Sequence, residues 1–152
     1  MNVKDLMIKN VATCGPETTL DTVALLMWDK DCGSIPIVDG EGALIGVITD
    51  RDIAMGCGLN HKAPWEITAR EVWNNRQVFT SHPDDDIHTA LQAMSEHRIR
   101  RLLVTDGNGH LEGILSADDI VACSEKGMSG RRAPELSYDD TMGMLKTVCI
   151  HH

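Results

Sequence analysis

The sequence contains one segment twice, and this repeat limits the folds that the chain can adopt. When the 152-residue sequence is shifted by 67 positions, residues 11–53 align with residues 78–120 without a gap. Twelve of these 43 positions are identical, whereas average residue frequencies would give about two or three. Residues 4–7 also align with residues 70–73 after a single-residue insertion. We therefore expect two copies of one supersecondary unit.

Each copy begins with a short segment that ends at a proline and precedes a predicted helix. Pro16 and Pro83 mark a turn, because proline cannot donate a backbone hydrogen bond to a sheet. Apolar residues then recur at i, i+3, i+4 and i+7, which is typical of one buried helical face. These residues are Leu20, Val23, Ala24 and Met27 in the first copy and Ile87, Ala90, Leu91 and Met94 in the second.

Three consecutive aspartates, residues 84–86, stand before the second of these helices. A metal-binding cluster is one interpretation of such a run. A helix start is the commoner one, because the positive end of the helix dipole favours negative charge. We therefore expect the triplet to begin the helix.

The rest of each copy is typical of a β-hairpin that leads into a second helix. Asp-Gly at residues 39–40 and 106–107 lies between two apolar runs, which is a strong hairpin signal. The second helix is expected to begin at about Asp50 and Ala117. Each copy is thus predicted to be strand–helix–strand–strand–helix, an α+β (α/β) fold class. Two copies should pack around a pseudo-twofold axis, because one cannot cover both faces of its small sheet.

These patterns predict four parts of the chain. They are a first repeat at 1–58, a connector at 59–68, a second repeat at 69–124 and a C-terminal tail at 125–152.

The tail is expected to contain a helix that begins near Ser137, since aspartates follow this serine. Its apolar stripe, which would dock on the domain or on a partner chain, is predicted to be Met142, Leu145 and Val148. The terminal His151 and His152 are a weak indication of metal binding.

Composition excludes several classes of partner. The net charge of −9 disfavours nucleic acid and anionic membranes. No apolar run approaches the roughly 20 residues of a membrane span. The five scattered cysteines include no Cys-x-x-Cys spacing and predict reduced thiols in a cytoplasmic protein.

A hydroxyl and an aspartate recur three residues apart, where each hairpin ends and a helix begins. Thr49-x-x-Asp52 and Ser116-x-x-Asp119 occupy equivalent positions. A carboxylate offers two acceptors to the two hydroxyls of a cis-diol, and a helix N-terminus favours phosphate. Helix capping is the alternative interpretation for each aspartate alone.

The stretches IVDGEGALIGVITDRDI (37–53) and VTDGNGHLEGILSADDI (104–120) carry a family resemblance. Over about residues 1–123 the chain resembles a stand-alone tandem pair of CBS domains, also called a Bateman module. The resemblance implies a regulatory unit that binds adenosine-containing ligands and forms a homodimer through helical faces. It implies no cofactor beyond the ligand, which would be AMP, ADP, ATP, S-adenosylmethionine or an NAD-like molecule.

The resemblance also assigns roles to residues. It implies that Asp52 and Asp119 accept hydrogen bonds from ribose hydroxyls, while Thr49 and Ser116 lie near phosphate. The base would be held by segments of the opposite copy. One site would combine Ser116 and Asp119 with residues 13–15 and 33–35, including Thr13, Gly33, Ser34 and Ile35. The other would combine Thr49 and Asp52 with residues 80–82 and 100–102, including Thr80, Arg100, Arg101 and Leu102.

Basic residues distinguish the two predicted sites. Arg100 and Arg101 lie in the densest basic cluster of the chain, and guanidinium groups suit phosphate oxygens. Their alternative role is to complement the dipole at a helix end. The first copy has Gly33-Ser34 at these positions, but it has Arg51 as a further phosphate ligand candidate. We therefore expect two non-equivalent sites.

Three functions compete. The first is ligand sensing between the two repeats, and the second is a structural dimerisation module with a vestigial pocket. The third is an enzyme that uses Asp50, Asp52, Asp118 and Asp119 as carboxylate or metal ligands. No nucleophile–base pair, Walker loop or HExxH motif accompanies those carboxylates, so no enzymatic activity is predicted.

Overall fold

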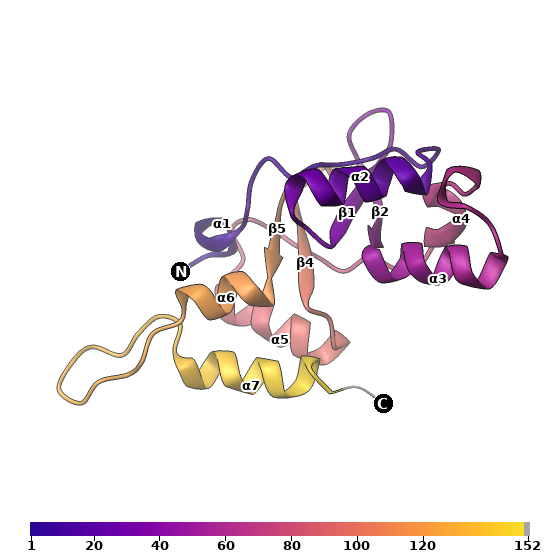
Figure 1. Cartoon of the computed structure of the whole chain (residues 1–152). Helices are drawn as coiled ribbons and strands as arrows, with labels where there is room; N and C mark the ends of the chain where they lie inside the picture. The colour runs from indigo at the N-terminus through magenta and orange to yellow at the C-terminus, as the bar shows by residue number, and fades with distance from the viewer. Residues whose placement is uncertain (151–152) are drawn as a thin grey trace. The chain divides into compact units, whose positions relative to one another are not determined.

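The computed structural model of the chain describes residues 1–150 (Figure 1). Helices and strands are mixed along the chain, which confirms the predicted fold class. In chain order the elements are α1 (Val3–Leu6), α2 (Leu20–Lys30), β1 (Ser34–Val38), β2 (Leu44–Thr49), α3 (Asp50–Asn60), the 3-10 helix η1 (Pro64–Glu66), α4 (Ala69–Trp73), β3 (Thr80–Ser81), α5 (Ile87–His97), β4 (Arg101–Thr105), β5 (Leu111–Ser116), α6 (Ala117–Cys123) and α7 (Tyr138–Val148). His151 and His152, which were only a weak indication of metal binding, lie outside the described residues.

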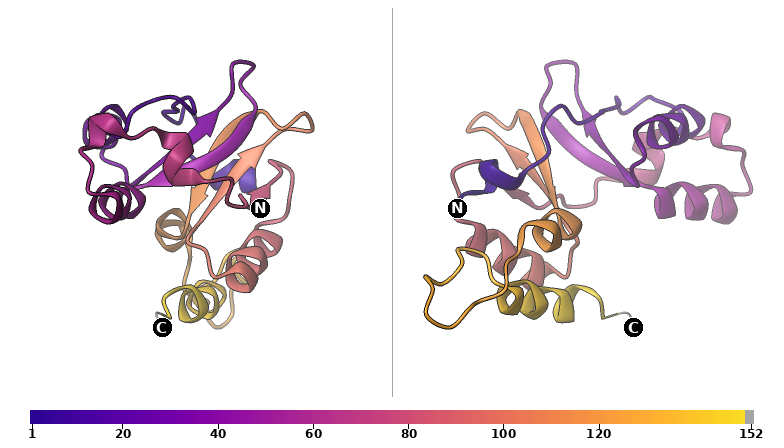
Figure 2. Two further views of the ribbon diagram at one scale, coloured as in Figure 1. Left: turned by 90° about the vertical axis from the view of Figure 1, so that its right-hand side faces the viewer. Right: turned by 60° about the vertical axis from the view of Figure 1, so that its left-hand side comes forward.

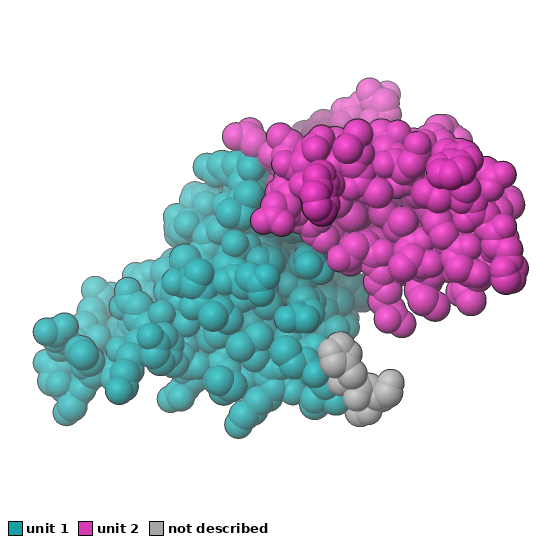
Figure 3. Space-filling view, viewed as in Figure 1, with its two compact units in different colours: residues 1–9, 79–107, 112–152 teal, residues 10–78, 108–111 magenta. Residues whose placement is uncertain are grey.

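The chain forms two compact units, which are coloured separately in Figure 3. Unit 1 contains residues 1–9, 79–107 and the chain from 112 onward, whereas unit 2 contains residues 10–78 and 108–111. Unit 1 therefore combines the helices of the second sequence copy with the leading helix α1. Unit 2 combines the helices of the first copy with α4, so each copy's leading helix belongs to the other unit.

Equivalent hydrogen bonds hold each leading helix in its unit. In unit 1 the N–H of Lys4 donates to the carbonyl of Pro83, and in unit 2 the N–H of Arg70 donates to that of Pro16, both at 2.9 Å. The two prolines are equivalent by the 67-residue shift, so both units repeat one contact. An ion pair accompanies each contact, between Lys4 and Asp84 at 2.6 Å and between Arg70 and Glu17 at 2.7 Å.

Two glycines allow the leading segments to approach the hairpins closely. A Cβ atom on Gly46 would lie 2.6 Å from the indole of Trp73. A Cβ atom on Gly113 would lie 2.7 Å from the carbonyl oxygen of Ile8 and 2.9 Å from Sδ of Met7. Met7 and Trp73 are equivalent in the alignment of residues 4–7 with 70–73, which explains why both copies have glycine there.

Unit 2 is built around the antiparallel pair β1–β2, in which Ser34 lies opposite Thr49. The predicted first strand of this copy is reduced to one bridge, because only Cys14 pairs with Ile37. Helices α2 and α3 lie on the same side of the hairpin in the right-hand view of Figure 2. The buried core cluster of this unit contains Cys14, Val23, Met27, Ile35, Ile37, Ile48 and Ala69.

Unit 1 contains the three-stranded sheet β3–β4–β5, in which β3 runs parallel to β4. Helices α5 and α7 lie side by side in Figures 1 and 2 and are in contact. The core is continuous from the sheet to α7, since residues of α5, β4, α6 and α7 belong to one buried cluster.

The helix starts agree with the sequence prediction. Helices α3 and α6 begin at Asp50 and Ala117. Asp86 is the N-cap of α5, and its side chain accepts a hydrogen bond from the N–H of His88 at 2.8 Å. This confirms the helix-start interpretation of the aspartate triplet.

Two predicted buried positions are wrong. Ala24 is exposed, although its equivalent Leu91 is buried. Met142 is also exposed, because the buried residues of α7 are Thr141, Met144 and Val148, with Leu145 partly buried. The buried and partly buried residues of α7 follow the i, i+3, i+4, i+7 spacing of one helical face. The predicted stripe took every third residue, and residues with that spacing do not stay on one face of a helix.

Across residues 1–150, none of the helices combines the length and apolar character that crossing a membrane requires.

Candidate functional site

In unit 2 the hydroxyl and the carboxylate of the first motif cap helix α3 reciprocally. The N–H of Asp52 donates to Oγ1 of Thr49 at 3.1 Å, and the N–H of Thr49 donates to Oδ2 of Asp52 at 2.8 Å. This is a capping box, which satisfies two backbone donors at the helix N-terminus. It holds the carboxylate in a defined orientation at the end of β2.

In unit 1 the second motif makes the same arrangement at the start of α6. The N–H of Asp119 donates to Oγ of Ser116 at 3.2 Å, and the N–H of Ser116 donates to Oδ2 of Asp119 at 2.9 Å. The hydroxyl of Ser116 also donates to Oδ2. The structure therefore brings the two residues of each predicted pair together.

A third capping box of this type begins helix α7 in the tail. Ser137 and Asp140 repeat these bonds, with the N–H of Asp140 donating to Oγ of Ser137 at 3.1 Å. Capping alone therefore does not distinguish a ligand site. In all three boxes the capping bonds reach Oδ2, so Oδ1 lies outside the box and can accept further hydrogen bonds.

Arg76 forms an ion pair with Asp52, one of the two predicted ribose-binding aspartates. The sequence did not predict a role for Arg76. Its Nη2 lies 2.9 Å from Oδ2 of Asp52, whose side chain is only 15% exposed. Partial burial acts to raise the pKa of Asp52, but the bonds from Arg76 and Thr49 outweigh it and hold this pKa below its ordinary value. Within the described part of the chain, Asp119 forms no ion pair.

No sequence signal pointed to Arg76, because it lies in the segment between the leading helix α4 and the second copy. Trp73 holds the backbone of Arg76 in this segment, because the indole N–H of Trp73 donates to the carbonyl of Arg76 at 3.0 Å. The Nε–H of Arg76 donates in turn to the carbonyl of Trp73 at 3.2 Å.

Two predicted base-binding segments lie in unit 2. The carbonyl of Gly33 accepts a hydrogen bond from the N–H of Asp50 at 3.0 Å, which joins this segment to the start of α3. Ser34 and Ile35 are buried at the beginning of β1. The remaining segment, Thr13–Gly15, lines a depression of about 530 Å³ together with residues 16–18 and 38–40.

The side chains of the first segment differ in exposure. Thr13 is exposed, whereas Cys14 is buried, and this burial raises the pKa of its thiol to about 11. Cys14 is therefore a neutral thiol at physiological pH rather than a nucleophile.

In unit 1 the equivalent segment is held by an aspartate of the triplet. Oδ2 of Asp85 accepts hydrogen bonds from the hydroxyl of Ser81 at 2.9 Å and from the N–H of His82 at 2.8 Å. Thr80 precedes them and is exposed. The structure therefore preorganises the turn that follows β3.

The predicted phosphate ligands are exposed at the ends of elements. Arg100 and Arg101 are exposed beside the buried Leu102 at the start of β4, and the carbonyl of Arg100 accepts from the N–H of Ala117 at 2.9 Å. Arg51 is exposed in the first turn of α3. Exposed guanidinium groups next to helix N-termini are suited to anion binding.

The sequence of this chain matches a known protein family. The family model of the CBS domain matches residues 3–56 and 69–126. The chain belongs to the CBS-domain family. It contains two CBS domains, which confirms the tandem pair predicted from the repeat.

Similar proteins include other CBS pairs. The CBS domain-containing protein YhcV of Bacillus subtilis is 37% identical over 122 residues, which cover 78% of this chain and 82% of that protein. The crystal structure of Hypoxic Response Protein I with two coordinated zinc ions is 29% identical with a TM-score of 0.73, covering 82% of this chain and 100% of that one. The CBS domain pair of protein MJ0100, solved with 5′-methylthioadenosine and S-adenosyl-L-methionine, is 30% identical with a TM-score of 0.72, covering 80% and 94%.

Some relatives are enzymes that are much longer than the CBS pair. A homoserine O-acetyltransferase of Methanohalophilus mahii is 35% identical over 127 residues, but this chain spans only 25% of that protein. The CBS domains are regulatory rather than catalytic, and in such enzymes they form a small part of the whole.

Among residues 1–150, no three His, Cys, Asp or Glu side chains are grouped so that they could hold a metal ion.

Proposed function

We propose that this CBS pair is a regulatory module that binds an adenosine-containing small molecule at its strand-to-helix junctions. The observation that carries the proposal is that Asp52 and Asp119 are oriented in the same way at equivalent junctions, where β2 leads directly into α3 and β5 leads directly into α6, with Oδ1 of each outside the cap. A carboxylate presented in this way can accept both hydroxyls of a ribose. The similar CBS pair of MJ0100 was solved with two such adenosine derivatives, which supports this ligand class over a vestigial pocket.

We further propose that the two junctions are non-equivalent ligand sites. The site of Asp119 would be occupied first, because Asp52 is already paired with Arg76. Candidate ligands remain AMP, ADP, ATP, S-adenosylmethionine and NAD-like molecules. Binding would act as a signal if it favoured one of two conformations of the pair.

Thermal denaturation with a panel of these ligands tests the proposal. A ligand at 100 times its Kd should stabilise the protein by about 2.7 kcal/mol. Asp119→Ala should reduce the shift, because it removes the site that is occupied first, and the double variant Asp52→Ala/Asp119→Ala should abolish it. Asp140→Ala is a matched control, because it removes the same kind of capping box from α7 and should leave the ligand shift intact. No shift with any ligand would instead support the structural module.

Two further features of the prediction remain proposals. All five cysteines are free thiols, which suits a reducing cytoplasm. The homodimer implied by the resemblance would be tested by measuring the mass of the protein in solution.

A further inference from the structure

At the junction in unit 2, one oxygen of the Asp52 carboxylate already has two donors. Oδ2 of Asp52 accepts from the N–H of Thr49 at 2.8 Å and lies 2.9 Å from Nη2 of Arg76. A carboxylate oxygen has two lone pairs, so both are in use. A ligand that bonds one ribose hydroxyl to each oxygen must therefore displace a donor. The N–H of Thr49 belongs to the backbone of the capping box, so the donor that leaves is Arg76.

In unit 1 the equivalent oxygen is held by a group that can turn away at little cost. Oδ2 of Asp119 accepts from the N–H and from the hydroxyl of Ser116. A hydroxyl rotates about its C–O bond and can donate elsewhere. A neutral ribose can therefore replace it without separating two charges. The corresponding exchange in unit 2 leaves the guanidinium of Arg76 without its anion.

The path of the backbone after each leading helix explains why an arginine reaches the junction in unit 2. In unit 1 the chain continues from α1 along β5, where Ile8 and Ile114 exchange two backbone hydrogen bonds at 2.8 and 3.0 Å. In unit 2 the chain turns after α4, because Asn74 and Asn75 have φ angles of 50° and 55°. Asparagine tolerates this left-handed conformation better than most residues. The turn brings Arg76 to Asp52.

The guanidinium of Arg76 is able to bond a second anion. Arginine has five N–H donors, and here Nε–H donates to the carbonyl of Trp73 while Nη2 pairs with Asp52. The Arg76 side chain is 53% exposed, so a ligand can reach it. The exposed Arg51 adds positive charge to this junction, whereas unit 1 has Asp118 at the equivalent position. Guanidinium groups match the geometry of phosphate oxygens.

We propose that Arg76 makes the Asp52 junction selective for adenosine ligands that carry a phosphate group. The ribose hydroxyls take both oxygens of Asp52, and Nη2 of Arg76 passes from Oδ2 to the phosphate. The Nε–H of Arg76 stays on the carbonyl of Trp73 and keeps the side chain in place. A neutral nucleoside breaks the same ion pair but offers no anion in return. This role of Arg76 rests on the proposed adenosine-binding function and adds the ligand class that one junction prefers.

AMP and adenosine are the probes, because they differ only in the phosphate group. Asp119→Ala leaves the Asp52 junction as the remaining site, and isothermal titration calorimetry measures both ligands on this protein. AMP should bind at least about tenfold more tightly than adenosine, since it gains a charged hydrogen bond from Arg76. Adding Arg76→Gln should lower this ratio by about tenfold. Adenosine itself should then bind about two- to fivefold more tightly, because no ion pair has to be broken.

Three further variants in the Asp119→Ala protein serve as controls. Arg70→Gln should leave the ratio unchanged, because Arg70 pairs with Glu17 of the same unit. Arg51→Gln should not raise the affinity for adenosine, since the ion pair of Asp52 is with Arg76. Arg76→Lys keeps the charge without the planar fork and should retain part of the preference for AMP. Urea midpoints show that each variant is folded.

The possible failures are distinguishable. An AMP-to-adenosine ratio that is the same with and without Arg76→Gln would overturn the role of Arg76 and leave the proposed function intact. Binding of both ligands to the unchanged protein but of neither to Asp119→Ala would do the same. Weaker binding of adenosine in Arg76→Gln would show that Arg76 holds the nucleoside instead of competing with it. No thermal shift with any adenosine ligand would overturn the proposed function and the role of Arg76 with it.

Discussion

Nη2 of Arg76 lies 2.9 Å from Oδ2 of Asp52, so one of the two equivalent junction aspartates is already in an ion pair. Asp119, its counterpart, is bonded to Ser116 of its own capping box. The two carboxylates therefore have different surroundings, and the non-equivalence of the two ligand sites stays a prediction.

Arg76→Gln should raise the pKa of Asp52. Burial alone acts upward on this pKa, and the Arg76 contact is the largest contribution that lowers it. Because the Arg76 side chain is about half exposed, the loss of stability at neutral pH should be only about 0.5–1 kcal/mol. NMR titration of the Asp52 carboxyl carbon measures the shift.

Arg70→Gln is the control for that experiment, because Arg70 of the same region pairs with Glu17 rather than with Asp52. An Asp52 pKa that is equal in Arg76→Gln and the unchanged protein would show that the ion pair is absent in solution.

Gly46→Ala and Gly113→Ala should each destabilise the protein by about 1–3 kcal/mol through overpacking. At Gly113 the new Cβ meets the backbone oxygen of Ile8, which cannot move as a side chain does, so this variant should be the less stable. Gly107→Ala is the control, since nothing lies within 4 Å of its added Cβ. Urea unfolding compares the three, and equal midpoints would contradict the close approach.

Met144→Ala should cost roughly 2–4 kcal/mol, because the side chain of Met144 is buried between α7 and the rest of unit 1. Met142→Ala, on the exposed side of the same helix, should stay within about 0.5 kcal/mol. Urea unfolding followed by circular dichroism measures both. Equal stability of the two variants would mean that α7 does not dock as described.

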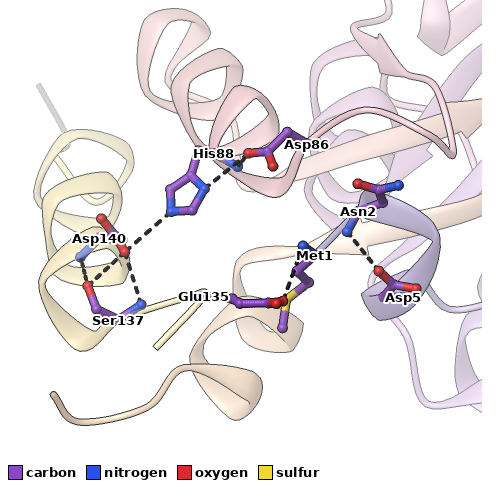
Figure 4. A network of polar contacts seen from close by, with 8 residues as sticks. All are labelled: Met1, Asn2, Asp5, Asp86, His88, Glu135, Ser137 and Asp140. Atoms are coloured by element: carbon purple, nitrogen blue, oxygen red, sulfur yellow. Dashed lines mark hydrogen bonds and ion pairs between the residues drawn. The ribbon is translucent and has the colours of Figure 1, made fainter. Parts of the chain in front are cut away.

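The start of α7 should make stability sensitive to acid. The hydroxyl and N–H of Ser137, followed by His88, hold the pKa of Asp140 below its ordinary value. Figure 4 shows His88 of α5 between Asp86, the N-cap of this helix, and Asp140 of α7, with Nδ1 of His88 3.0 Å from Oδ1 of Asp86. The ionised Asp140 therefore stabilises the folded state above the unfolded aspartate pKa of about 3.9.

Asp140→Asn should lower stability by about 1 kcal/mol near neutral pH, as loss of a cap does. The difference from the unchanged protein should shrink as pH falls through the lowered pKa of Asp140. Asp139→Asn, one residue earlier, controls for the charge of the first turn. Urea midpoints measured from pH 7 to below the Asp140 pKa provide the test, and a difference that is constant with pH would contradict it.

Local patterns were sufficient for much of this structure. The starts of α3 and α6, the hairpin turns and the capping role of Asp86 all depend on residues within a few positions of one another. Backbone donors at a helix start must be satisfied locally, so the sequence shows where this happens. Because the sequence repeats, the helices and strands predicted in one copy could be predicted at the equivalent positions of the other copy.

Exposure was predicted less well, because it depends on what covers a helix. Ala24 and Leu91 occupy equivalent positions in helices of the same pattern, yet only Leu91 is buried. The tail helix α7 makes this difference, and its docking surface could not be read from the periodicity of α5.

By itself the sequence determined two copies of one fold and a hydroxyl–aspartate pair at each strand-to-helix junction. Only the tertiary structure decided that α1 joins the unit of the second copy, that α4 joins the unit of the first, and that Arg76 reaches Asp52. The physical reason is that these contacts join residues far apart along the chain. No local pattern records them, because they arise from the path of the folded backbone.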